Sequence, residues 1–214
     1  MKIEAVIFDY GGVLCFHPPD EQIGELAARA GAPHARFVET YWALRFEYDR
    51  GDVTYVEYWR EFGRRVGRDY SERDIDEFVQ LDVAFWLHVD QRMVEWARSL
   101  RRAGRKVALL SNMPRELGEH MKSQFAWLRD FDHLTLSYEV RAAKPEPAIY
   151  RDAVEGLGVA PEKALFLDDR AENVEAARAF GLRAARFESA EAFRSSAREA
   201  HDFLGLGAPP ILLE

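Results

Sequence analysis

The feature that most constrains the fold is an apolar run near the N-terminus that ends in an acidic residue and a glycine pair. Residues 3–8 read Ile-Glu-Ala-Val-Ile-Phe, and Asp9, Tyr10, Gly11 and Gly12 follow directly. A short apolar run that stops at turn residues is typical of a buried β-strand. Because aspartate before glycine is also ordinary turn chemistry, Asp9 is either a turn cap or a site residue at a sheet edge.

The second half of the chain alternates between helices and short apolar strands. Strands are predicted at residues 106–110, 134–137, 164–167 and 182–187, and helices at 93–104, 117–128, 145–157, 172–180 and 190–204. Alternation at this spacing predicts right-handed crossovers and a parallel sheet covered on both faces. We therefore expect an α/β fold with a doubly wound parallel-sheet core.

The region between the first strand and residue 90 has a different pattern. Apolar residues recur at helical spacing in four stretches, 20–31, 33–51, 54–66 and 71–86, with Asp20 and Thr54 as expected N-caps. Successive amphipathic helices predict a small helical bundle. The expected domains are a core formed by residues 1–15 and 90–214 and a helical insertion formed by residues 16–89.

Charge and cysteine content restrict the partners. The net charge of −8 argues against a nucleic-acid or acidic-membrane surface, since both need a basic field. The single cysteine, Cys15, excludes an internal disulfide, fits a reducing compartment and is best interpreted as a small apolar residue. With no run of transmembrane length, we expect a cytoplasmic protein without nucleic-acid or membrane partners. An anionic small molecule would need locally concentrated positive charge.

Chemically capable side chains follow the first four predicted strands of the core. Ligands of open parallel sheets bind beyond the carboxyl ends of the strands. The residues at those positions are Asp9, Ser111, Asn112, Lys144, Asp168 and Asp169. We expect them to converge on one cleft.

Such a cluster predicts a metal ion and phosphate chemistry. Crowded carboxylates repel one another unless a cation or protons neutralise them. Oxygen ligands without a His or Cys cluster favour Mg²⁺, which often binds together with a substrate phosphate. Ser111 and the start of the following helix could hold phosphate oxygens, and Lys144 would supply a positive charge. Attack of an aspartate on phosphorus is an established covalent strategy.

Four motifs in this order resemble the haloacid dehalogenase superfamily, most of whose members are Mg²⁺-dependent phosphatases with this fold. The motifs are Phe8-Asp9-Tyr10-Gly11-Gly12-Val13-Leu14, Leu110-Ser111-Asn112, Lys144-Pro145-Glu146-Pro147, and the run of residues 166–177 that contains Asp168 and Asp169. The helical insertion resembles the mobile cap of one branch. Residues 48–54 and the aspartate pair are similar to α-glucose-1-phosphate phosphatases and to the phosphatase domain of soluble epoxide hydrolase.

The resemblance implies a role for each matching position. Asp9 would be the nucleophile and a metal ligand, and the carbonyl of Gly11 a second ligand. Asp169 would bind Mg²⁺ directly, with Asp168 and Asn173 in support. Ser111 and Asn112 would hold the phosphoryl group and Lys144 would neutralise it. We therefore expect a Mg²⁺-dependent phosphatase for a small phosphorylated metabolite, with sugar phosphates among the candidates, acting as a monomer or homodimer.

Gly11 departs from the family pattern, because phosphatases of this family usually carry a second aspartate there as acid and base. Positioned proton transfer is worth ~10²–10⁴-fold. Three alternatives follow. The chain is a phosphatase whose leaving group needs little help or whose acid lies elsewhere, a dehalogenase or phosphonate-cleaving hydrolase, or a pseudo-phosphatase that only binds its ligand. We favour the first, since the nucleophile, lysine and metal carboxylates are retained.

Several other residues receive a structural interpretation. His17 is the nearest substitute acid, but a lone histidine before prolines is more often an exposed loop residue. Arg45 and Arg50 could reach a substrate from the insertion, although salt-bridged or solvated arginines are commoner. The five tryptophans are interpreted as packing residues.

Overall fold

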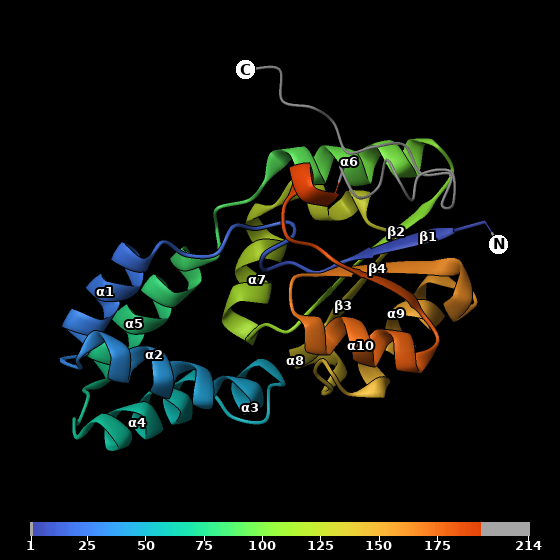
Figure 1. Ribbon diagram of the computed structural model, residues 1–214. Coiled ribbons are helices and arrows are strands. Elements are labelled where there is room, and N and C mark those ends of the chain that lie inside the picture. The colour runs from blue at the N-terminus through green and yellow to red at the C-terminus, as the bar shows by residue number, and fades with distance from the viewer. Residues whose placement is uncertain (1, 194–214) are drawn as a thin grey trace.

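The computed structural model describes residues 2–193 and contains a five-stranded parallel sheet in the order β3-β2-β1-β4-β5 (Figure 1). The strands are β1 (Ala5–Phe8), β2 (Lys106–Ser111), β3 (His133–Leu136), β4 (Ala164–Asp168) and β5 (Arg183–Arg186). All four strand pairs are parallel, with β1 at the centre between β2 and β4. The predicted α/β fold with a doubly wound parallel sheet is confirmed.

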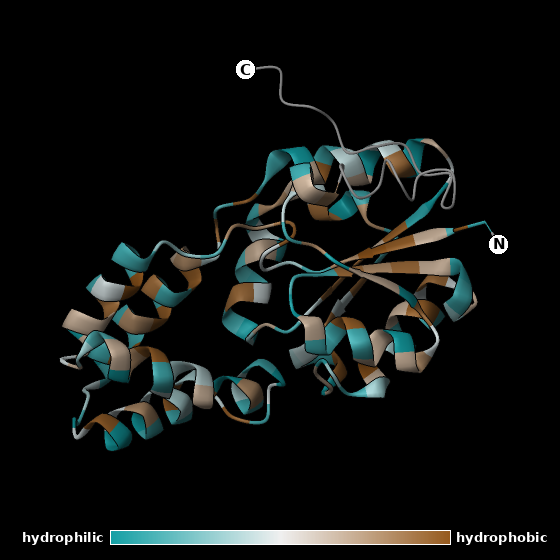
Figure 2. Ribbon diagram, in the orientation of Figure 1, coloured by the Kyte–Doolittle hydropathy of each residue, from teal (hydrophilic) through white to brown (hydrophobic). Residues whose placement is uncertain are grey.

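Helices bury the two faces of the sheet separately (Figure 1). Val6 and Phe8 of β1 pack on the side of α6 (Gln91–Arg102), whereas Ala5 and Ile7 pack on the opposite side, because successive strand residues point to opposite faces. The first layer also contains α7 (Arg115–Gln124) and the 3₁₀ helix Ala126–Asp130, and the second contains α9 (Pro147–Leu157) and α10 (Ala171–Phe180). The central strands are largely hydrophobic (Figure 2), as a sheet covered on both faces requires.

The helices between β1 and α6 form a bundle to one side of the sheet (Figure 1), which we call the insert. They are α1 (Asp20–Arg29), α2 (His34–Ala43), α3 (Arg45–Asp49), α4 (Tyr55–Val66) and α5 (Glu72–Phe85). Aromatic rings from α2, α4 and α5 fill its centre, including Phe37, Trp59, Phe62 and Phe78. The predicted cap Thr54 is confirmed, since its side chain accepts from the Glu57 amide in a capping box.

Four consecutive residues, Tyr48 to Gly51, tie the insert to the core, and we call this segment the clasp. The Tyr48 hydroxyl donates to Glu116 over 2.9 Å, and Arg50 Nη1 donates to Glu146 over 2.9 Å. The other two contacts use clasp carbonyls: Ser137 Oγ donates to Asp49 O, and Arg141 Nη1 donates to Gly51 O. Side chains of both partners thus fix α3 against the carboxyl end of the sheet.

Three helix predictions in the insert and beside β2 are wrong in detail. The single helix expected over residues 33–51 is interrupted at Leu44, where no glycine or proline marks a break; there the Arg45 guanidinium bonds Tyr41 and Asp82. The helix over 117–128 ends at Gln124, and a 3₁₀ turn follows. Asp20 is the first helical residue rather than the N-cap, and its carboxylate lies 3.1 Å from His34 Nε2 instead.

Two further boundaries differ beyond β3. The expected strand 134–137 ends at Leu136, and Ser137 starts the short helix α8 (Ser137–Val140). The helix expected from residue 145 begins at Pro147, since a residue before proline is pushed to extended geometry, as Glu146 is. A 3₁₀ turn, Pro161–Lys163, precedes β4. Of the last predicted helix, residues 190–193 are helical and the remainder lies outside the described residues.

Across residues 2–193 the helices are too short or too polar to cross a bilayer. The expected domain boundaries, residues 1–15 and 90–214 for the core and 16–89 for the insertion, stay a prediction.

Candidate active site

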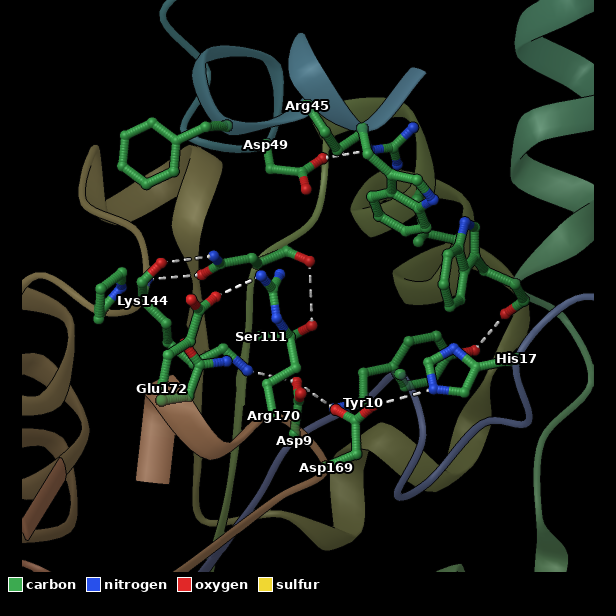
Figure 3. A pocket seen from close by; sticks show the side chains of 18 residues that line it. Asp9, Tyr10, His17, Arg45, Asp49, Ser111, Lys144, Asp169, Arg170 and Glu172 are labelled. Carbon is green, nitrogen blue, oxygen red and sulfur yellow. Dashed lines mark hydrogen bonds and ion pairs between the residues drawn. The ribbon is translucent and has the colours of Figure 1, made fainter. Parts of the chain in front are cut away.

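A cavity of about 430 Å³ lies between the carboxyl edge of the sheet and the insert. The core lines it with residues that follow β1, β2 and β4, and the insert lines it with residues of α2 and α3 (Figure 3). The core residues include Asp9, Gly11, Ser111, Asn112, Lys144, Asp169 and Asn173. Most of the wall that the core contributes therefore consists of residues that were predicted from their positions after strands.

Lys144 links two buried carboxylates at the base of the cavity. Its Nζ lies 2.6 Å from Asp9 Oδ1 and 2.7 Å from Asp168 Oδ2. Asp168 is fixed further by the Arg170 amide at 2.8 Å and by Asn173 Nδ2 at 3.0 and 3.1 Å. Asp168 and Asn173 therefore orient the lysine that reaches Asp9.

The electrostatics of this cluster leave a deficit of positive charge. Burial raises the pKa of Asp9, although Lys144 opposes the rise. Burial would lower the pKa of Lys144, but Asp168 and Asp9 outweigh it and the pKa rises. Burial would raise the pKa of Asp168, but the Lys144 ammonium and the hydrogen bonds that Asp168 accepts lower this pKa below its ordinary value. One ammonium serves two carboxylates, so a further cation would stabilise the ionised site.

The carboxylates could supply such a cation with ligands. Oxygen atoms of Asp9, Asp168 and Asp169 lie within 4.8 Å of one another. Within residues 2–193, Asp9 Oδ2 accepts no hydrogen bond, whereas both Asp168 oxygens are occupied. Asp169 is partly exposed, and its Oδ2 lies 2.9 Å from His17 Nε2. Mg²⁺ prefers oxygen ligands, and among the described residues Asp9 Oδ2 and Asp169 Oδ1 have no hydrogen-bond or ion-pair partner, so both could bind it.

The two residues after β2 have different surroundings. Ser111 is buried, and within residues 2–193 its Oγ reaches only the Asn112 carbonyl, at 3.4 Å. The Asn112 side chain donates to Lys144 O over 3.0 Å and accepts from Lys144 N over 2.8 Å. Asn112 therefore fixes the Lys144 backbone, and its main chain is the part left to contact a phosphoryl group.

The glycine pair makes room for two neighbours. A Cβ at Gly11 would lie 3.1 Å from Trp86 Cζ3, so this indole fills the space that a side chain at position 11 would use. Gly12 has φ +72°, and a Cβ there would lie 2.7 Å from Asp169 Cγ and 2.8 Å from His17 Nε2. Position 12 requires glycine for both its backbone and this close approach.

We expect Gly12→Ala to lower the free energy of unfolding by more than the ~1–2 kcal/mol cost of a left-handed alanine, because the methyl also displaces Asp169. Urea unfolding measures the loss. Gly67→Ala is the matched control, since Gly67 has φ +73° and its Cβ would meet nothing within 4 Å. Equal losses in the two variants would contradict the steric argument.

The insert contributes an ion cluster and aromatic rings to the cavity. Arg45 is buried and donates from Nε to Asp49 Oδ1 over 2.7 Å and from Nη1 to Asp82 Oδ2 over 2.7 Å. Burial raises the pKa of Asp49 to about 6, and Asp82 adds to the rise while Arg45 and Lys144 oppose it. Asp49 thus combines a cavity position with a pKa far above that of an ordinary aspartate.

The structural interpretations of the remaining residues have mixed outcomes. Arg45 is salt-bridged as expected, and so is Arg50, which bonds Asp52 and Glu146. Trp59 and Trp96 are buried packing residues, whereas Trp42 and Trp86 line the cavity.

The two loop residues after β1 also differ from each other. His17 is exposed, as expected for a loop histidine, yet it lines the cavity beside Asp169. Cys15 is buried, and burial raises its thiol pKa to about 11, which excludes a neutral-pH nucleophile.

Sequence reasoning missed the cavity-lining roles of Tyr10, Trp42, Asp49, Trp86 and Glu172. Tyr10 adjoins the predicted nucleophile, and Glu172 lies just after the aspartate pair, so strand-end proximity could have found both. The other three belong to the insert or its edge. No periodicity shows which face of a bundle meets a sheet edge.

Known proteins match this chain over most of its length. Residues 3–181 match the family of haloacid dehalogenase-like hydrolases. Phosphatase MT3486 of Mycobacterium tuberculosis is 31% identical over 189 residues, which cover 86% of this chain and 87% of the relative. D-ribitol-5-phosphate phosphatase of Bacteroides thetaiotaomicron is 26% identical over 188 residues, covering 84% and 89%.

A solved structure agrees with the fold. The HAD family enzyme bt-2542 from Bacteroides thetaiotaomicron, in complex with magnesium and inorganic phosphate, has a TM-score of 0.70 at 23% identity, covering 86% of this chain and 93% of that one. The family match spans β1 to β4 and ends just before β5, and the Mycobacterium relative spans a similar share of the chain. The chain therefore belongs to the haloacid dehalogenase-like hydrolase family.

Proposed function

We propose that this hydrolase is a Mg²⁺-dependent phosphatase that cleaves a small phosphate monoester through an aspartyl-phosphate on Asp9. The observation that carries the proposal is the free Asp9 oxygen beside Asp169 and the Lys144–Asp168 pair, at one end of a cavity of about 430 Å³. Two relatives named as phosphatases support it, as does the magnesium and phosphate bound by bt-2542.

The chain offers residues for the metal and for the phosphoryl group. Asp9, Asp169 and the carbonyl of Gly11 would hold Mg²⁺, with Asp168 and Asn173 in support. When bound, Mg²⁺ supplies positive charge against the transferring phosphoryl group. Ser111 Oγ would donate to a phosphoryl oxygen, and the Lys144 ammonium would balance its charge.

The reaction would proceed in two displacements. In the first, Asp9 Oδ2 bonds to phosphorus, the bond from phosphorus to the leaving oxygen breaks, and that oxygen keeps the electron pair and takes a proton. In the second, water bonds to phosphorus and the bond to Asp9 breaks, which releases inorganic phosphate and a proton and restores the carboxylate.

A sugar phosphate is the substrate class that the branch resemblance favours. A cavity of about 430 Å³ suits a small ligand such as a sugar phosphate. The similarity to D-ribitol-5-phosphate phosphatase supports a phosphorylated polyol as the substrate. A screen of phosphorylated metabolites with Mg²⁺ would identify the substrate. Cytoplasmic location and a monomeric or homodimeric state stay predictions.

Removal of Mg²⁺ tests the proposed function directly. We expect hydrolysis of p-nitrophenyl phosphate with Mg²⁺ and its loss in EDTA, because Asp9 and Asp169 repel an anionic ester without a cation. Release of p-nitrophenolate measures the rate, and excess Mg²⁺ should restore it. Turnover that is indifferent to the chelator would exclude the metal-dependent mechanism.

A dehalogenase or phosphonate-cleaving hydrolase is the second candidate. Trp86 over Gly11 favours it, because a halide leaves without a proton and needs no acid at that position. Chloride release from 2-chloropropionate without metal would identify a dehalogenase. A pseudo-phosphatase would instead retain a phosphorylated ligand without forming product.

A further inference from the structure

The first displacement needs an acid that position 11 does not supply. An alcohol that departs as its alkoxide is a poor leaving group, and a positioned acid accelerates its departure by ~10²–10⁴-fold. The indole of Trp86 occupies the space beside Gly11, so the donor must lie on another wall of the cavity.

Outside the Asp9, Lys144 and Asp169 cluster, the titratable side chains of residues 2–193 that line the cavity are Tyr10, His17, Arg45, Asp49, Arg170 and Glu172. The arginines stay charged and the Tyr10 hydroxyl already donates to Trp86 O, which leaves His17, Asp49 and Glu172 as candidate acids. His17 is 57% exposed and lies against Asp169, where a metal ligand is expected. Glu172 is 56% exposed and pairs with Arg170. Asp49 is buried, at 8% exposure. Burial and freedom from the metal cluster single out Asp49.

The position of Asp49 suits the geometry of phosphoryl transfer. Asp49 and Arg45 lie on the insert side of the cavity, while Asp9 and Asp169 lie on the opposite side (Figure 3). Attacking and leaving oxygens lie roughly in line across phosphorus. A leaving group displaced by Asp9 therefore departs toward the insert. We infer that Asp49 is the general acid that protonates this leaving group, an inference that rests on the proposed phosphatase function.

The surrounding contacts hold Asp49 in place and leave one carboxyl oxygen available. Arg45 Nε occupies Oδ1, and within residues 2–193 no hydrogen bond reaches Oδ2. Its main-chain carbonyl accepts from Ser137 Oγ, which itself accepts from the Met113 amide over 2.9 Å. Met113 follows Asn112 directly, so Asp49 is tied to the loop that carries the expected phosphate-binding residues.

The charges facing Asp49 tune it for proton donation. Among residues 2–193 they are Arg45 on its own helix, Asp82 from the insert and Lys144 from the core, and the neutral phenol of Tyr58 also faces it. Burial is the largest influence and raises the Asp49 pKa to about 6. An acid with a pKa near the working pH keeps a protonated fraction and still donates readily.

The proton balance closes over one catalytic cycle. The Oδ2–H bond of Asp49 breaks as the bond from phosphorus to the leaving oxygen breaks, and the proton passes to that oxygen to give the alcohol. The resulting Asp49 carboxylate is stabilised by Arg45. It then accepts a proton from the water that attacks the phosphoryl group on Asp9, which restores the acid.

Two aryl esters of different leaving ability test the inference through kcat/KM with Mg²⁺. This parameter covers only the steps up to departure of the alcohol. We expect Asp49→Asn to lose ~10²–10⁴-fold on phenyl phosphate and little on 2,4-dinitrophenyl phosphate, whose phenolate needs no proton. The matched control is Asp82→Asn, which disturbs the same guanidinium from outside the cavity lining; at a pH below the alkaline limb of all the proteins compared, it should affect both esters alike.

The pH profile provides a second readout. Because Asp49 donates only when protonated, wild-type kcat/KM for phenyl phosphate should fall as pH rises through about 6. Asp49→Asn should lack this alkaline limb, and comparing both proteins on one ester cancels the ionisation of the ester. In Asp82→Asn the limb should move to lower pH, since a repelling charge is removed.

The outcomes separate the two proposals. If wild type cleaves neither ester with Mg²⁺, the proposed function fails. If wild type cleaves both esters and Asp49→Asn loses the same factor on each, the phosphatase stands and the inference is overturned, because a purely structural role affects both esters equally. If Asp49→Asn does not fold, the pH profiles of wild-type kcat/KM for the two esters decide. If the two profiles have the same shape after correction for ionisation of the esters themselves, the inference about Asp49 is also overturned.

Discussion

Replacing Asp9 with asparagine is expected to lower kcat for p-nitrophenyl phosphate by at least about 10³-fold, as loss of a nucleophile does elsewhere. An amide oxygen does not form a stable ester with phosphorus. Asparagine has the same size and its Oδ1 can still accept the 2.7 Å hydrogen bond from the Tyr10 amide. The chain should therefore fold while losing activity, which circular dichroism and phosphate release would measure together.

Asp20→Asn is the control for this substitution. It makes the same chemical change at an aspartate of α1 whose side chain is 86% exposed and does not line the cavity. Its activity should stay at the wild-type level. Retention of activity in Asp9→Asn itself would exclude the aspartyl-phosphate.

Lys144→Met is expected to cause the largest loss of stability. Methionine preserves length but leaves the buried Asp9 and Asp168 without their shared cation, and removing one partner of a buried ion pair costs about 3–5 kcal/mol. Urea unfolding in EDTA would measure the free energy. Adding Mg²⁺ should recover part of the loss, because a bound cation again balances the carboxylates.

Lys163→Met removes a different lysine from a carboxylate at a similar distance. Lys163 Nζ lies 2.9 Å from Glu4 Oε1, but both side chains are well exposed, so the loss should be much smaller and independent of Mg²⁺. Equal losses at the two lysines would show that burial of the Lys144 cluster is not what makes it costly to break.

The sequence predicted the sheet better than the helix boundaries. The three central strands, β1, β2 and β4, are short apolar runs that stop at polar or turn residues, and this pattern needs no long-range information; the outer strands β3 and β5 are half polar. The break at Leu44 carries no glycine or proline, and Arg45, which follows it, is held by Tyr41 and by Asp82 on a later helix. Such tertiary contacts leave no mark on local periodicity.

The site residues also divide into those that local sequence predicts and those that depend on tertiary contacts. Asp9, Ser111, Lys144 and Asp169 follow strands of a parallel sheet, so topology alone brings them to one edge, and the structure places them around one cavity. Their catalytic roles stay predictions. The insert wall was not predictable, because the orientation of a bundle on a sheet depends on contacts between residues far apart in sequence.

Asn112 shows why position does not determine a role. The family resemblance implied that Asn112 holds the phosphoryl group; its side chain bonds the Lys144 backbone, so that predicted contact would fall to its main chain. Only the three-dimensional partner distinguishes a residue that touches substrate from one that positions its neighbour.

The clasp ties the position of the proposed acid to the contact between the insert and the core. Asp49 belongs to the segment Tyr48 to Gly51 that joins the insert to the core through four successive contacts. If the insert swings away to admit an ester, as a mobile cap would, those contacts break and the proposed acid is withdrawn with them. An ester that prevents the clasp contacts from re-forming would then dissociate uncleaved. Substrates would therefore be distinguished when the insert closes as well as when they bind.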